Sequence, residues 1–96
     1  MVHAFTQDVP IDLPTYEKII ANLGPDPLEG CILHLCVRRV DGGLRYIDVW
    51  ESEQKCADAF DQRIHPAVDQ ALGGNRPAEE PHSDRLDVLH ASGSAL

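Results

Sequence analysis

The sequence predicts an α+β fold of the ferredoxin-like type, and three observations indicate it. Four short segments are rich in aliphatic and β-branched residues, as is typical of strands. Two longer segments carry apolar residues at helical spacing, one before and one after the central pair of strands. The resulting order of strand, helix, strand, strand, helix, strand places both helices on one face of a four-stranded antiparallel sheet.

The first two elements are a strand and a helix. Residues 2–7, "VHAFTQ", alternate weakly between apolar and polar side chains and are followed by turn and cap residues. Residues 12–23, "DLPTYEKIIANL", combine a cap at Asp12 or Leu13, a proline in the first turn and apolar residues at helical spacing. Gly24 and Pro25 are predicted to end this helix.

The central hairpin follows a short loop. Residues 31–40, "CILHLCVRRV", are too uniformly apolar for a strand with one exposed face, so we expect both faces to be covered. Residues 41–43, Asp-Gly-Gly, can supply the positive φ angles of a tight turn. Residues 44–50 should therefore return antiparallel beside the first strand of the hairpin.

The register of this hairpin depends on the length of its turn. With a three-residue turn, His34 faces Trp50 and Cys36 faces Asp48, which puts imidazole, indole and carboxylate on one face. With a two-residue turn, His34 faces Val49 and the cluster does not form. The sequence leaves both registers open.

The second helix and the last strand complete the fold. Ser52 is a good N-cap for a helix that runs to about Leu72 and stops at two glycines. Pro66 should remove one backbone hydrogen bond inside that helix and bend it. A polar loop then leads to a final strand at residues 85–91, "RLDVLHA".

The length and charge of the chain limit its organisation and its partners. Ninety-six residues are too few for two cores, so we expect one domain over residues 1–90 and a flexible tail over residues 91–96. The formal net charge of −8 disfavours nucleic acid, because binding to phosphates relies on clustered Lys and Arg.

Localisation is predicted from what the chain lacks. No apolar run approaches the roughly 20 residues of a membrane helix, and the N-terminus does not resemble a signal peptide. Three cysteines, Cys31, Cys36 and Cys56, are an odd number, and the first two lie too far apart on one strand to form a disulfide. We therefore expect a cytoplasmic protein with reduced cysteines and no membrane association.

An uncovered sheet face predicts a homodimer. Both helices cover the same face, yet the segment at residues 31–40 is apolar on both of its faces. A single copy would expose the second face to water. The simplest way to bury it is a second copy that packs sheet against sheet in an isologous dimer.

The chain resembles the antibiotic biosynthesis monooxygenase group of the dimeric α/β barrel superfamily. The resemblance lies in the order of its elements, in "EGCILHL" and above all in "RYIDVWESEQKCADAF". Members commonly show a Gly-Cys-apolar start to the second strand, and an Arg-Tyr followed by a Trp-Glu-Ser junction into the second helix. The resemblance implies a dimeric barrel of two ferredoxin-like subunits. It does not select one reaction, because relatives oxidise phenolic substrates without cofactors, degrade haem or isomerise lactones.

Haem chemistry is the less favoured of these functions. The haem-degrading relatives use an Asn on the first strand and a Trp and a His along the second helix. The first strand here offers no Asn, Phe60 lies near the position of the Trp, and Asp69 lies near the position of the His. His65 lies about one turn earlier and could bind haem iron from that shifted position. We nevertheless expect no cofactor.

The candidate catalytic residues are His34 and Asp48. His34 interrupts an apolar strand, where a buried imidazole needs a partner for each nitrogen or serves as a base or hydrogen-bond donor. Asp48 is the second polar residue at a nominally buried position, and it would either orient His34 or pair with an arginine at a dimer interface. The predicted walls of the ligand pocket are Trp50, Tyr46, Phe60 and His65.

Metal binding has little support. His3, His34 and His90 fall on predicted strands that could lie side by side, but no closely spaced ligand pair such as Cys-x-x-Cys accompanies them. We expect no metal.

Two functions follow from these residues. The first is cofactor-independent oxidation of a small aromatic or polyketide-like compound. The alternative is a non-catalytic barrel that binds a small ligand or is associated with stress.

Overall fold

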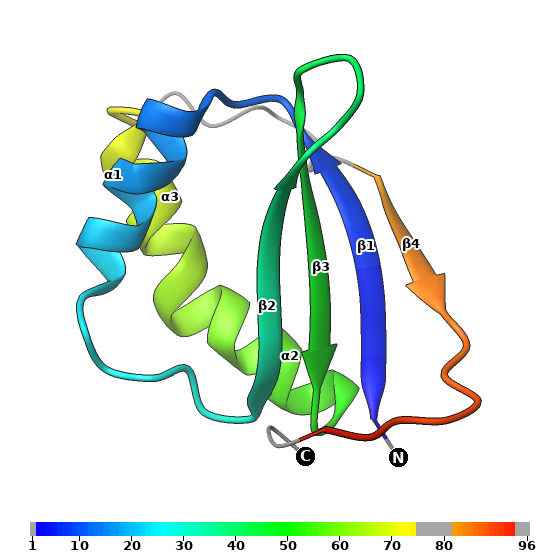
Figure 1. Cartoon of the computed structure of the whole chain (residues 1–96). Helices are drawn as coiled ribbons and strands as arrows, with labels where there is room; N and C mark the ends of the chain where they lie inside the picture. The colour runs from blue at the N-terminus through cyan, green and yellow to red at the C-terminus, as the bar shows by residue number, and fades with distance from the viewer. Residues whose placement is uncertain (1, 75–81, 94–96) are drawn as a thin grey trace.

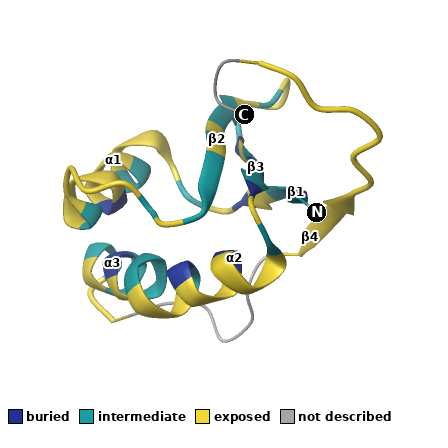
Figure 2. Cartoon of the chain, turned by 90° about the horizontal axis from the view of Figure 1, so that it is seen from below, coloured by how far each residue is buried: buried dark blue, intermediate teal, exposed yellow. Residues whose placement is uncertain are grey.

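The computed structural model describes residues 2–74 and 82–93, and its elements follow the predicted order. The elements are β1 (His3–Val9), α1 (Leu13–Leu23), β2 (Cys31–Arg38), β3 (Leu44–Trp50), α2 (Glu53–Ala59), the π-helical η1 (Phe60–Ile64), α3 (His65–Ala71) and β4 (Ser83–Leu86). The strands form one antiparallel sheet in the order β2-β3-β1-β4. The helices lie on one side of it (Figures 1 and 2). The predicted ferredoxin-like α+β fold is confirmed.

The first strand and helix keep their predicted identities. Strand β1 continues beyond the predicted end to Val9. Helix α1 begins after Asp12, whose carboxylate accepts a hydrogen bond from the backbone N–H of Thr15 at 2.9 Å. The helix ends at Gly24, as predicted, where the backbone has a φ of 78°.

The β2–β3 hairpin adopts a register that neither predicted turn gives. His34 lies opposite Asp48, and Cys36 lies opposite Tyr46. The register predicted for a three-residue turn pairs His34 with Trp50, whereas the observed register pairs it with Asp48, two positions away. Because side chains alternate between the faces of a strand, a shift of two positions keeps the same side chains on one face. The predicted polar cluster therefore forms, although both predicted registers were wrong.

The reason is a longer loop. The last pair of the ladder is Arg38 with Leu44, so residues 39–43 all belong to the turn. Within it, the backbone N–H of Arg39 donates to the carbonyl of Gly43 at 2.7 Å, and the N–H of Gly42 donates to the carbonyl of Arg39 at 2.9 Å. Gly42 has a φ of 92°, a value that favours glycine.

The second helix is continuous in space but not uniformly α-helical. Ser52 caps it as predicted, accepting a hydrogen bond from the N–H of Lys55 at 3.1 Å. The segments α2, η1 and α3 follow one another along a single rod (Figure 1). Where a bend was predicted at Pro66, the structure has a π-helical segment just before it, and this wider turn lets the chain continue past a residue that has no N–H to donate.

The last strand differs from its prediction. Strand β4 spans Ser83–Leu86, so the predicted strand at residues 85–91 is wrong beyond Leu86. Leu86 already lies opposite Ala4, near the beginning of β1, and the residues that follow have almost no partner strand left. Parts of the predicted loop and tail, residues 75–81 and 94–96, lie outside the described residues.

The two faces of the sheet have different surroundings. On the helical face, the buried side chains of Phe5, Trp50, Cys56 and Ala59 form the core. On the other face, which we call the open face, Leu33, Leu35 and Leu86 are 40%, 42% and 41% exposed. No helix within the described residues is long and apolar enough to span a bilayer.

Candidate functional site

Four hydrogen-bonded side chains on the helical face form what we call the polar chain: Tyr16, His34, Asp48 and Trp50. The hydroxyl of Tyr16 lies 2.8 Å from His34 Nε2. His34 Nδ1 lies 2.6 Å from Asp48 Oδ1, and Trp50 Nε1 lies 3.1 Å from Asp48 Oδ2. Side chains from α1, β2 and β3 thus join into one continuous hydrogen-bonded series.

The register of the hairpin creates this arrangement. Because His34 and Asp48 pair directly across β2 and β3, their side chains leave the sheet on the same side, and Trp50 follows Asp48 on that side. Asp48 is only 2% exposed. A buried carboxylate needs hydrogen-bond donors, and His34 and Trp50 supply one for each oxygen. Within one chain, the side-chain partners of Asp48 are thus His34 and Trp50, and the predicted alternative of an arginine partner at a dimer interface stays a prediction.

The donors and acceptors of the polar chain can be assigned from its two ends. The indole N–H of Trp50 can only donate, so Asp48 accepts from it, and Asp48 also accepts from the Nδ1–H of His34. A neutral imidazole with its proton on Nδ1 has an acceptor at Nε2, which takes the hydroxyl proton of Tyr16. Asp48 therefore selects the tautomer in which His34 Nε2 is basic.

Tyrosine rings enclose the imidazole. The Tyr46 ring meets His34 edge-on at 5.1 Å between centroids and lies 5.6 Å from the ring of Tyr16. Burial, together with the nearby Cys36 and Asp48, raises the pKa of Tyr16 to about 12. Burial also raises the pKa of Tyr46 above its ordinary value. Both phenols therefore stay protonated at neutral pH.

The polar chain is accessible at one point. Strand β2 is an edge strand of the sheet, and the side chain of His34 is 29% exposed although both of its nitrogens are hydrogen-bonded. Tyr16 is half-buried on α1 beside it. The Tyr16 end of the polar chain is thus partly exposed to solvent, whereas the Asp48 end is sealed within the core.

A second feature of the helical face is a cavity of about 520 Å³ that we call the aromatic pocket. It lies between β1, β4 and the α2–η1 segment, and four rings along its lining, His3, Phe5, Phe60 and His65, form a series with centroids 5.8, 6.2 and 5.7 Å apart. Among the described residues, no hydrogen-bond partner is found for the buried Nδ1 of His3. Charged side chains, those of Glu53, Asp61 and Arg85, line the same pocket.

The predicted site residues divide between these two features. His34, Asp48, Tyr46 and Trp50 belong to the polar chain or pack against it, whereas Phe60 and His65 line the aromatic pocket. Trp50 connects the two, because its indole N–H binds Asp48 while its ring lies 6.3 Å from that of Phe60.

Tyr16 is the functional candidate whose place the sequence did not reveal. A tyrosine within an amphipathic helix commonly lies at the boundary between the apolar and the polar face. Helical periodicity does not predict which strand residue such a tyrosine contacts. Its contact with His34 joins residues 18 positions apart.

Thiol and metal chemistry find no support in the described residues. The three cysteines are free, and burial raises the pKa of each thiol, that of Cys56 to about 12. Thiols with raised pKa values are poor nucleophiles. In the described part of the chain, no group of three His, Cys, Asp or Glu side chains is placed to hold a metal ion.

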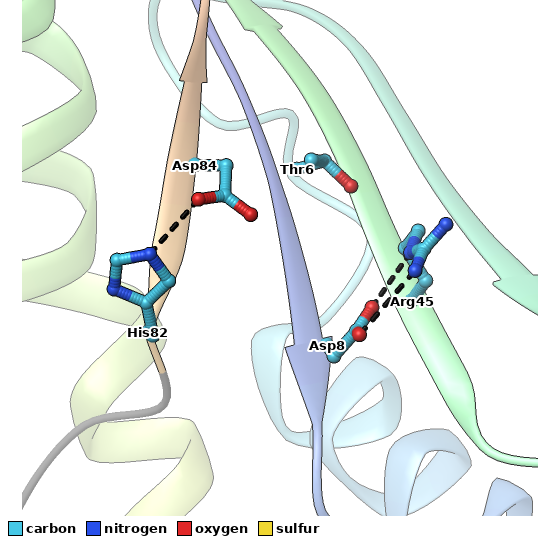
Figure 3. A pocket seen from close by; sticks show the side chains of 5 residues that line it. All are labelled: Thr6, Asp8, Arg45, His82 and Asp84. Carbon is cyan, nitrogen blue, oxygen red and sulfur yellow. Dashed lines mark hydrogen bonds and ion pairs between the residues drawn. The ribbon is translucent and has the colours of Figure 1, made fainter.

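A smaller cavity, of about 200 Å³, lies on the open face between β4, β1 and β3 (Figure 3). Its charged residues are paired with one another. Arg45 Nε donates to Asp8 Oδ1 at 2.6 Å, and His82 Nε2 lies 2.8 Å from Asp84 Oδ1. These pairs resemble ordinary surface ion pairs, and we assign no site here.

Neither known protein-family profiles nor curated protein sequences match this chain. Several solved structures, however, match it. A candidate antibiotic biosynthesis monooxygenase from Chloroflexus aurantiacus superposes with a TM-score of 0.57 at 17% identity, covering 97% of this chain and 100% of its own. The fold is shared with the antibiotic biosynthesis monooxygenase group. Identities this low establish the monooxygenase fold and nothing finer.

Two further structures have this monooxygenase fold. The protein Rv0793 from Mycobacterium tuberculosis has a TM-score of 0.66 and 14% identity, over 96% of this chain and 98% of its own. SnoaB from Streptomyces nogalater, a cofactor-independent oxygenase, has a TM-score of 0.57 and 16% identity, over 94% of this chain and 93% of its own. The matches span nearly the whole length of each protein.

Proposed function

We propose that this protein is a cofactor-independent oxygenase that acts on a small hydroxylated aromatic or polyketide-like compound. The observation that carries the proposal is the Asp48–His34 pair, in which a buried carboxylate holds an imidazole with its basic nitrogen directed toward the accessible end of the polar chain. The oxygenase SnoaB, which has the same fold, supports this class of reaction.

The role of His34 is general base. Removing the proton of an aromatic hydroxyl produces an electron-rich anion that can reduce dioxygen directly. One oxygen atom then enters the product at a ring carbon, and the other leaves as water, which takes the hydrogen of that carbon and the proton removed from the hydroxyl. The imidazolium formed at His34 is stabilised by Asp48, and general base catalysis of this kind contributes about 10²–10⁴ in rate.

Assembly is part of the proposal. We propose a homodimer in which the open faces of two copies pack together, because this buries the exposed Leu33 and Leu35. We also propose a cytoplasmic location, in keeping with the three free cysteines.

The test is oxygen consumption by the purified protein with a panel of small hydroxyarenes, without added metal, flavin or haem. We expect turnover in the wild type and a loss of about 10²–10⁴ in kcat/KM for His34→Gln. His82→Gln, an exposed histidine on the other side of the molecule, is the matched control and should retain full activity. An active His34→Gln variant would refute the role of His34 as base.

Haem supplies a separate check. Titration with haem should produce no tight Soret shift, because we propose a reaction that the chain performs with substrate and dioxygen alone. Tight binding accompanied by haem breakdown would replace this proposal with haem oxygenation.

A second candidate function is ligand binding without turnover, and the aromatic pocket favours it. Its series of four rings suits an aromatic ligand whether or not a reaction follows, as does His3 Nδ1, for which the described part of the chain offers no hydrogen-bond partner. Trp50, the single tryptophan, lies against Phe60 of the pocket, so its fluorescence should report occupancy. Saturable quenching by hydroxyarenes that are never consumed would favour this function over the first.

A further inference from the structure

We infer that Tyr16 carries the proton from substrate to His34, so that Tyr16 is the catalytic residue that touches the substrate and His34 acts through it. The inference rests on the proposed function. It begins with the occupancy of the imidazole. His34 Nδ1 is held by Asp48 at 2.6 Å and His34 Nε2 by the hydroxyl of Tyr16 at 2.8 Å. No ring nitrogen is left for a substrate hydroxyl.

Tyr16 can accept a hydrogen bond from a substrate hydroxyl, whereas His34 cannot. A phenolic hydroxyl has one hydrogen to donate and two lone pairs. With its hydrogen directed to His34 Nε2, the oxygen of Tyr16 keeps acceptor capacity for a hydroxyl that arrives from outside. Tyr16 also lies at the accessible end of the polar chain, whereas Asp48 and Trp50 at the other end are buried.

The proton transfer balances at every atom. The hydrogen of the substrate hydroxyl moves to the oxygen of Tyr16 while the hydrogen of Tyr16 moves to Nε2 of His34. Tyr16 is neutral before and after, His34 becomes an imidazolium paired with Asp48, and the substrate becomes an aryl oxide. Since the pKa of Tyr16 is raised to about 12, its free phenolate is disfavoured, so the two transfers occur together.

Two neighbours complete the description. Tyr46 packs its ring against His34, at 5.1 Å between centroids, and thereby holds the imidazole plane. The hydrogen bonds of the two His34 nitrogens go to Asp48 and Tyr16 and not to the hydroxyl of Tyr46. Cys36 is half-buried and its thiol has a raised pKa, so it does not compete as a base. Of these groups, Tyr16 is the one hydrogen-bonded to the ring nitrogen of His34 that does not face Asp48.

The mechanism restricts the substrate. It needs a hydroxyl on the aromatic ring, placed where it can donate to the Tyr16 oxygen. The methyl ether of any accepted hydroxyarene has no proton to transfer, and we expect it to bind without reacting.

The experiment compares Tyr16→Phe, His34→Gln and the double variant. If the two residues act in series, each single variant loses about 10²–10⁴ in kcat/KM, and the double variant loses no more than either single one. Glu17→Gln, an exposed neighbour on α1, is the control that should match the wild type. A Tyr16→Phe variant that keeps its turnover while His34→Gln loses it would overturn the inference and leave the proposed function standing.

A second readout does not need turnover. The phenolate of 4-nitrophenol absorbs in the visible, so its ionisation on binding can be followed directly. We expect the wild type to increase the ionised fraction of the bound probe, and Tyr16→Phe and His34→Gln to abolish the increase. Ionisation that depends on Tyr16 without any oxygen consumption would remove the oxygenase proposal and keep the proton path. A wild type that does not ionise the probe, or a Tyr16→Phe variant that still does, would contradict the proton path.

Thermal melting of each variant, followed by circular dichroism, identifies any loss of activity or of probe ionisation that is caused by unfolding. Tyr16→Phe keeps the ring that packs against Tyr46, so we expect it to remain folded.

Discussion

Asp48 is the residue on which the polar chain depends, because its carboxylate is hydrogen-bonded to both His34 and Trp50. Its carboxylate is buried and accepts a hydrogen bond at each oxygen. An apolar residue at this position would leave two buried donors without partners. The charge therefore serves the fold as well as the chemistry, and the two roles need separate measurements.

Asp48→Asn separates these roles. The amide keeps the shape of the carboxylate but can accept at only one of its two positions, so the His34 tautomer is no longer held. We expect kcat/KM to fall by about 10²–10⁴ and the free energy of unfolding to fall by about 1–3 kcal/mol. Steady-state kinetics and urea denaturation measure the two effects, with Asp87→Asn on the exposed segment after β4 as the control. Unchanged kinetics would remove Asp48 from the mechanism.

The raised pKa of Tyr16 predicts sensitivity to alkali. In the unfolded chain a tyrosine ionises near pH 10, whereas in the folded protein the pKa of Tyr16 is about 12. Its contribution to stability is therefore complete below about pH 10 and is lost as the pH rises toward about 12, because only the unfolded state releases the proton there. Urea denaturation across this range should show a shallower decline for Tyr16→Phe than for the wild type. Tyr46 and Cys56, whose pKa values are also raised, should leave a residual decline in that variant.

At the scale of elements, caps and turns decide where the helices begin and how the strands pair. Both helix starts follow a side chain that was recognisable in the sequence, Asp12 for α1 and Ser52 for α2. The hairpin was less predictable. Asp-Gly-Gly marks a turn, but the hydrogen bonds of Arg39 to Gly43 and Gly42 enlarge it and shift the register that brings His34 to Asp48.

The cap at Ser52 can be tested by substitution. Its hydroxyl accepts from the N–H of Lys55 at 3.1 Å, and Ser52→Ala leaves that donor without its partner. We expect the free energy of unfolding to fall by about 0.5–2 kcal/mol in urea denaturation, and Ser52→Asp to restore most of it. An alanine variant as stable as the wild type would show that water replaces the cap. Since Ser52 follows Trp50 closely, activity should be measured on the same samples.

The π-helical segment illustrates what a sequence signal leaves open. Pro66 predicted a lost backbone hydrogen bond and a bend in the second helix, whereas one missing N–H is also compatible with the wider turn that the structure has. Helix α3 packs against α1, and the side-chain amide of Asn22 donates to the carbonyl of Ala67 at 3.1 Å. The tertiary contacts therefore favour the solution that leaves the helix continuous.

For the whole molecule, the contrast between the two sheet faces is the main physical feature. The helices α1, α2 and α3 lie over the helical face (Figure 2). On the open face, by contrast, Leu33 and Leu35 of β2 and Leu86 of β4 are exposed. Apolar area of this kind is stabilised by a second copy that covers it, and a small single domain gains stability from the additional burial.

Leu35→Lys tests the proposed dimer. Leu35 is 42% exposed on the open face, and a buried lysine at a sheet-to-sheet interface would lack a partner. We expect the dissociation constant, measured by sedimentation at micromolar concentration, to rise at least about tenfold, equivalent to about 1.4 kcal/mol. Ile20→Lys on α1 is a matched control, because Ile20 has the same exposure but lies in the helical layer. A monomeric wild type would refute the dimer.

The amino-acid pattern by itself determined the order and type of the elements, both helix caps, the acidic surface and the excess of apolar side chains on β2. These are local or compositional properties, and each depends on periodicity, cap chemistry or charge within a short stretch of chain. Tertiary structure alone decided that Tyr16 meets His34, that His34 pairs with Asp48, and that β4 ends at Leu86. Each of these depends on register or helix docking, which are determined by contacts between residues far apart in the chain.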